Sequence, residues 1–81
     1  MLKIYGSKLC KDCVACLEAF DKAGVACEYL DFADSLINLK EFLSIREGNP
    51  LFDEVREAGG IGIPCILRPD GSITLDWESC M

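Results

Sequence analysis

Cys10-Lys11-Asp12-Cys13 decides the fold of this 81-residue chain, because these residues stand where a short strand meets a helix. Leu2–Tyr5 before them is rich in strand-forming residues, and Val14–Ala23 after them continues the apolar stripe of a helix. At a helix start, free backbone N–H groups and the positive end of the helix dipole favour a thiolate over a thiol. The pattern therefore predicts redox chemistry. Cys10 attacks a disulfide, and Cys13, about one turn on, attacks the resulting mixed disulfide.

Two other interpretations of the cysteines stay open. Free cysteine packs well in hydrophobic cores, so the pair could be purely structural. Cys16 extends the spacing to three cysteines, which is the opening of a bacterial ferredoxin-type cluster motif. The fourth ligand of that motif would fall on Phe20, and no proline follows it. A zinc site would need a second, separate cysteine pair or histidines, and the chain has neither.

The composition indicates a single domain that spans residues 1–81. Hydrophobic residues make up 51% of the chain, whereas disulfide-stapled secreted domains are poor in core residues. We therefore expect the six cysteines to be mostly thiols in a reducing cytoplasm. Charges at Lys3, Lys8, Lys11 and Asp12 interrupt any signal peptide, and no run approaches the roughly 18–20 apolar residues of a membrane span. The formal net charge of −6 argues against nucleic acids and anionic membranes as partners.

The first half of the chain is predicted to form a strand–helix–strand unit. The strand over residues 2–5 leads into a helix over residues 11–23, and Gly24 is well placed to end that helix in a left-handed conformation. Residues 25–32 follow as a second strand. Strands joined in this way usually lie parallel with a right-handed crossover, so we expect that arrangement here.

Two helical stretches are predicted next. Asp34 or Ser35 caps a helix that ends near Glu47-Gly48. Asn49-Pro50 begins a shorter one that stops at Gly59-Gly60. The pattern leaves open whether these are two helices or one kinked helix.

A hairpin is predicted to close the fold. Two apolar runs, residues 63–68 and 72–75, flank a Pro-Asp-Gly turn, which is typical of antiparallel strands. Residues 77–81 then leave room for about one helical turn.

Pro64 opens the first strand of this hairpin, which is unusual because proline removes a donor from the hydrogen-bond ladder. The plain interpretation is a proline at a strand edge or strand start. Beside a Cys-x-x-Cys helix, Gly62-Ile63-Pro64 is instead predicted to form a cis-proline loop next to the cysteine pair. The backbone of Ile63 could then pair with an extended peptide or with glutathione, as an added strand does.

The cysteine pair and the later proline, in this order of elements, resemble those of the glutaredoxins of the thioredoxin-fold superfamily. Within them, the chain is similar to the small bacterial glutaredoxin-related proteins. The resemblance covers nearly the whole chain. It implies a thioredoxin-like, glutaredoxin-type α/β fold: a four-stranded mixed sheet in the order β-α-β-α-β-β, with helices packed on it and a truncated C-terminal helix.

The chain also departs from the family pattern. Lys11-Asp12 replaces the usual Pro-Tyr between the cysteines, and Ser7 stands where the family usually has a lysine. Leu75-Asp76-Trp77-Glu78 replaces the family's glycine pair and acidic pair, which hold the γ-glutamyl end of glutathione.

The resemblance implies roles residue by residue. Cys10 matches the nucleophile and Cys13 the resolving cysteine, and together they form the redox-active disulfide. Ile63 and Pro64 match the residues that hold the substrate backbone. Lys8 is expected to assist substrate binding and, with Lys11 and the helix dipole, to favour the Cys10 thiolate, while Asp12 opposes it.

We therefore predict a cytoplasmic, monomeric thiol–disulfide oxidoreductase that contributes to electron transport and cell redox homeostasis. It would reduce protein or glutathione mixed disulfides without a bound cofactor or metal, with glutathione as the expected co-substrate or a flavin-dependent reductase as electron donor. One alternative is a metal- or iron–sulfur-binding module that uses Cys10, Cys13 and either Cys16 or Cys65. Another is a binding domain without turnover. Cys65 is expected to lie in the core, with a place in the Cys10 pocket as the second option.

Overall fold

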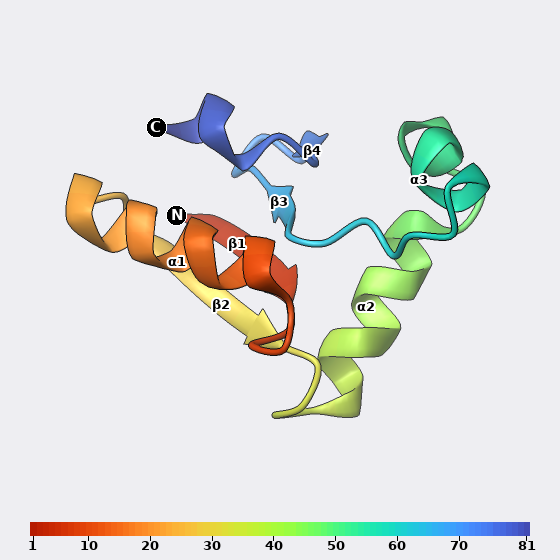
Figure 1. Ribbon diagram of the computed structural model, residues 1–81, viewed down its shortest axis with the longest axis horizontal. Helices are drawn as coiled ribbons and strands as arrows, with labels where there is room; N and C mark the ends of the chain where they lie inside the picture. The colour runs from red at the N-terminus through yellow and green to blue at the C-terminus, as the bar shows by residue number, and fades with distance from the viewer.

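Strand β1 (Leu2–Gly6) is the centre of the sheet in the computed structural model, which describes residues 1–81. β1 pairs in parallel with β2 (Cys27–Asp31) on one side. On the other side it pairs antiparallel with β3 (Cys65–Leu67), which in turn pairs with β4 (Ile73–Thr74). The strand order is β2-β1-β3-β4 (Figure 1), so the prediction of a four-stranded mixed α/β sheet is confirmed.

Helix α1 (Lys11–Ala23) has the bounds that the sequence predicts. Gly24 ends it in the left-handed region with φ 69°, and its N–H bonds back to the last turn. A side chain at that φ would clash with the backbone, so glycine is the residue suited to this stop.

The middle of the chain forms separate helices, which answers the question that the sequence left open. The Ser35 hydroxyl oxygen caps α2 (Leu36–Arg46) by accepting a hydrogen bond from the Ile37 N–H. Asn49 caps the short 3₁₀ helix η1 (Pro50–Phe52) in the same way, and α3 (Asp53–Glu57) follows directly.

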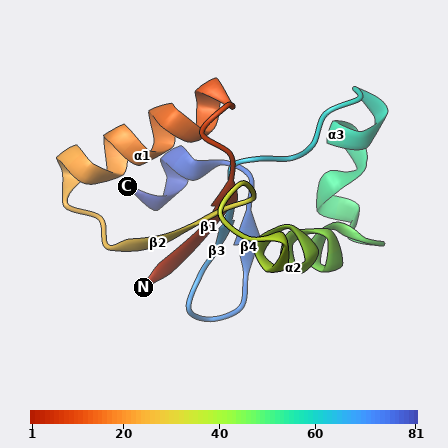
Figure 2. The same cartoon turned by 90° about the horizontal axis from the view of Figure 1, so that it is seen from below.

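The alternation of side chains along β1 divides the core between the two faces of the sheet. Ile4 faces α1, where it packs with Cys16, Phe20 and Ile66. Tyr5 faces the opposite side, where it packs with Phe42 of α2, Phe52 of η1 and Cys65. Figure 2 shows α1 and the C-terminal 3₁₀ helix η2 (Trp77–Cys80) on one side of the sheet and α2 on the other.

In both views the segment from α3 to β3 passes beside the loop at the start of α1 (Figure 1, Figure 2), which brings the two predicted site regions together. None of the helices has the length and apolar character that crossing a lipid bilayer requires.

Candidate functional site

Cys10 stands at the start of α1, on the residue that precedes the first helical turn. Its backbone is extended (φ −95°, ψ 122°), and its carbonyl accepts the first helical hydrogen bond from the Val14 N–H at 3.1 Å. The thiol is partly exposed, and its sulfur lies 4.0 Å from the carbonyl oxygen of Ile63. The predicted nucleophile is therefore accessible and stands at the positive end of the α1 dipole.

Cys13 lies one turn further along α1 and is fully buried. Burial raises the pKa of its thiol to about 12, the Ser7 backbone opposes that rise, and the neighbouring Cys10 thiol adds to it. Cys13 is thus a neutral thiol in contact range of Cys10, which is the arrangement predicted for a resolving cysteine.

The Ile63–Pro64 peptide bond is cis, and Ile63 lies beside Cys10, so both parts of that prediction are confirmed. Ile63 belongs to no strand, and its N–H donates no hydrogen bond within the protein. Its carbonyl accepts only the long contact from the Cys10 thiol. The backbone of this residue is therefore available to a ligand.

A groove of about 640 Å³ opens next to the Cys10 sulfur. Nine residues line it, none of which carries a charge: Ser7, Leu9, Cys10, Phe32 and the run Gly59–Ile63. Leu9 is 96% exposed and Ile61 is 56% exposed, so two large apolar side chains are presented to solvent beside the nucleophile. Their exposure indicates a contact surface for an apolar group.

Lys8 and Pro64, the other predicted substrate-binding residues, do not line this groove. The Lys8 side chain is exposed, and its backbone N–H donates to the Asp31 carboxylate at 3.2 Å. Pro64 is buried. Their contact with substrate stays a prediction.

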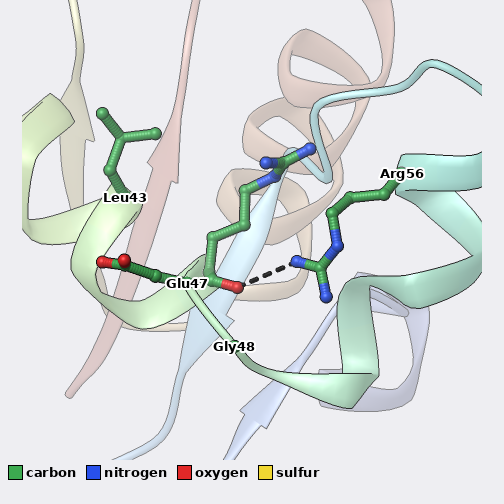
Figure 3. Close-up of a pocket in the computed structure, with 5 residues that line it drawn as sticks. Leu43, Glu47, Gly48 and Arg56 are labelled. Carbon is green, nitrogen blue, oxygen red and sulfur yellow. Dashed lines mark hydrogen bonds between the residues drawn. The ribbon is translucent and has the colours of Figure 1, made fainter.

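Arg46 holds the wall of the groove in place from α2. Its guanidinium donates to the carbonyl oxygens of Ile61 at 2.9 Å and Gly60 at 3.2 Å. Arg56 in turn donates to the Arg46 carbonyl at 3.0 Å, as Figure 3 shows. The pocket in that view, about 540 Å³ between α2 and α3, does not include Cys10. Both arginines serve to fix the loop.

The remaining cysteines do not join the pair in one cluster. Cys16 packs on the α1 face of the sheet, and Cys65 packs on the opposite face with Tyr5. The prediction that Cys65 is a core residue is confirmed, since it is fully buried there. No three cysteine, aspartate or glutamate side chains lie where they could hold a metal ion together. The metal-binding alternative therefore finds no ligand set in this fold.

Sequence reasoning missed the groove walls and the buried Asp31 behind the cysteine pair. Gly59 and Gly60 were interpreted only as a helix stop, although the run of glycines up to Gly62 signals a close backbone approach. Asp31 ends β2 beside the end of β1, and carboxyl ends of parallel strands meet at one edge of a sheet. That rule could have placed Asp31 near the site.

Three buried thiols make stability depend on pH. Burial raises the pKa of Cys13, Cys16 and Cys65 from 9.0 to about 12. The unfolded chain therefore releases these protons above pH 9, while the folded protein keeps them until about pH 12. Their contribution is fully present below pH 9 and is lost as the pH rises towards 12.

We expect the free energy of unfolding in urea, with reductant present, to fall as the pH rises above about 9, because the unfolded chain then loses thiol protons that the folded protein keeps. In Cys65→Ala, which lacks one of the three buried thiols, the free energy of unfolding should fall less steeply above about pH 9. An unfolding free energy that stays constant from about pH 8 to about pH 10.5 would contradict the burial argument.

The fold and the site define a small α/β protein with a Cys-x-x-Cys pair at a helix start, opposite a proline loop. No protein-family model matches the chain, and no solved structure matches it. An uncharacterized protein of Haemophilus influenzae is 32% identical over 73 residues, a match that covers 90% of this chain and 85% of that protein. The chain belongs to the same family as that protein.

Proposed function

We propose that this protein is a thiol–disulfide oxidoreductase of the glutaredoxin type, with a thioredoxin-like fold. One observation carries the proposal. The partly exposed Cys10 sulfur lies 4.0 Å from the Ile63 carbonyl at the edge of a groove, with the buried Cys13 one turn behind it. A nucleophile, a second thiol within reach and a free backbone segment for the substrate are the parts that disulfide exchange needs.

The reaction proceeds in two exchanges. The Cys10 thiolate attacks one sulfur of a substrate disulfide, so that a Cys10–substrate disulfide forms and the other substrate sulfur leaves as a thiolate with the electron pair of the broken bond. Cys13 then attacks the Cys10 sulfur, and its proton passes to the departing substrate sulfur. The Cys10–Cys13 disulfide forms, and the second substrate thiol is released. The substrate gains two electrons, which glutathione or a flavin-dependent reductase returns to the protein.

The groove favours an extended polypeptide as the substrate. The N–H and carbonyl of Ile63 can pair with a substrate backbone as a neighbouring strand would. The exposed Leu9 and Ile61 can contact apolar side chains next to the substrate disulfide. Glutathione carries carboxylates, whereas the groove lining has no charged side chain, so the groove offers no ion pair that would favour glutathione over a peptide disulfide. A reducing cytoplasm is the compartment in which this cycle would be sustained.

Cys13→Ser is expected to trap the mixed disulfide, because Cys10 can still attack but nothing resolves the product. Incubation with a disulfide-linked peptide, followed by mass spectrometry of the intact protein, should show one adduct on Cys10 that persists. The wild type should show free thiols or an internal disulfide.

Cys16→Ser is the matched control, since Cys16 lies one turn beyond Cys13 on the same helix and is equally buried. It should accumulate no adduct. An adduct that is equally long-lived in both variants, or one on a cysteine other than Cys10, would refute the assignment of Cys13 as the resolving residue.

A further inference from the structure

The hydroxyl of Tyr29 is a buried polar group that makes no hydrogen bond of good geometry, although the Asp31 carboxylate lies close enough to interact with it. Tyr29 lies on β2 opposite Ile4 of β1, and its side chain packs on the α1 face of the sheet. Burying a hydroxyl without a partner is unfavourable, and such groups are few in folded proteins. A role outside the stability of the resting protein would explain why a tyrosine stands here.

Gly6 shows which group lies next to Tyr29. A Cβ built on Gly6 would lie 2.7 Å from the Cys13 sulfur and 3.5 Å from Cε1 of the Tyr29 ring. The sulfur of Cys13 and the hydroxyl-bearing end of the ring therefore border the same small space above Gly6. Apart from the neighbouring residues in the chain, no other side chain comes nearer than these two to that position.

Asp31 closes this region from the end of β2, where it is paired in register with Gly6 and is 1% exposed. Its carboxylate accepts hydrogen bonds from the N–H groups of Ala33 at 2.7 Å and Lys8 at 3.2 Å. These bonds, that of Ala33 foremost, lower the pKa of Asp31 despite its burial. The carboxylate is therefore a fixed anion and has no proton to donate.

Unlike the Asp31 carboxylate, the Tyr29 hydroxyl keeps its proton. Burial raises its pKa, and the nearby Asp31 and Cys13 raise it further. Its hydroxyl thus stays protonated over the working range of the protein. Of the two oxygen-bearing side chains behind Cys13, only Tyr29 can donate a hydrogen bond to a sulfur that is becoming negative.

We propose that the Tyr29 hydroxyl donates a hydrogen bond to the Cys13 sulfur during the second exchange, and so assists release of the substrate. This inference rests on the proposed function. As the buried Cys13 attacks the mixed disulfide, its proton passes to the departing substrate sulfur and the Cys13–Cys10 bond forms. The Cys10–substrate bond breaks, and the electron pair leaves on the substrate sulfur. The Tyr29 O–H stabilises the charge on Cys13 before that bond is complete.

The two exchanges can be timed separately with dithiobis(nitrobenzoate), a small aromatic disulfide whose two thiolate products are coloured. Attack by Cys10 releases the first nitrothiobenzoate, and attack by Cys13 on the remaining mixed disulfide releases the second. One molar equivalent of reagent is mixed rapidly with reduced protein. Cys13→Ser, which can release only the first product, identifies the second phase.

Tyr29→Phe is expected to slow the second phase by about tenfold or more, the size typical for loss of a hydrogen bond to a charged group. The first phase should keep its rate. The midpoint potential of the Cys10–Cys13 couple should not change, because neither the dithiol nor the disulfide carries the transient charge. The variant should still fold, since phenylalanine keeps the ring and only the hydroxyl is removed.

Tyr5→Phe is the matched control, because its hydroxyl is bonded to Glu41 on the opposite face of the sheet. Both phases should keep their rates in that variant. A second phase of unchanged rate in Tyr29→Phe, or equal slowing of both phases, would overturn the role of Tyr29 while leaving the proposed function in place. A wild type that shows no second phase would instead overturn the proposed function, and this inference with it.

Discussion

Cys10→Ser is expected to abolish disulfide reduction, down to the rate seen without protein. A serine hydroxyl does not ionise at neutral pH, so the variant has no nucleophile for the first exchange. Cys13 cannot take over that role, because it is fully buried and its pKa is raised to about 12. The measurement is the reduction of a disulfide-linked peptide with glutathione as electron donor, followed by separation of the products.

Cys27→Ser is the control for this result. Cys27 is also a partly exposed thiol, but it lies at the start of β2 and packs against the Ile4 cluster, away from the groove. Its loss should leave the rate of reduction within a few-fold. Full activity in Cys10→Ser, or equal losses in the two variants, would remove Cys10 from the site.

Gly62→Ala is expected to cause the largest loss of stability among the loop glycines. Gly62 has φ 95°, and a Cβ at this position would lie 2.6 Å and 2.7 Å from two carbons of the Phe52 ring. Phe52 is fully buried against Phe42 and Tyr5, so the ring cannot move aside. The backbone conformation costs an alanine about 1–2 kcal/mol and the overpacking about 1–3 kcal/mol more.

Gly71→Ala separates these two costs, because Gly71 has φ 89° but no atom lies within 4 Å of the Cβ position. Urea unfolding should show a loss of about 1–2 kcal/mol for Gly71→Ala and about 2–5 kcal/mol for Gly62→Ala. Equal losses of stability in the two variants would show that the Phe52 ring moves aside. Gly62→Ala should also lower disulfide reduction, since it displaces the groove wall next to Ile63.

The sequence predicts best the features that depend on local chemistry. The bounds of α1 follow from the apolar stripe and from the glycine that ends it, and both are short-range signals. The caps at Ser35 and Asn49 are local as well. The second strand was predicted over residues 25–32 but begins at Cys27. The reason is that the Val25 N–H bonds to the Phe20 carbonyl and so belongs to the end of α1.

The groove and the place of Tyr29 behind Cys13 could not be predicted, because distant residues make them. The position of Gly60 and Ile61 depends on Arg46, which lies 14 and 15 residues earlier in the chain. The alternation along β2 is mixed, so the faces of Tyr29 and Asp31 are defined only by the register with β1. No pattern in the sequence encodes either contact.

Glycine is needed at position 6 because the fold leaves no room there for a side chain. Its φ is not positive, so the backbone would accept alanine there, but the added carbon would lie 2.7 Å from the Cys13 sulfur. A larger residue at position 6 therefore requires the Cys13 sulfur to shift from its place. In this chain Gly6, Cys10 and Cys13 therefore depend on one another in space. A relative that keeps both cysteines but has a bulky residue in place of Gly6 is expected to hold the sulfur of its second cysteine in another position.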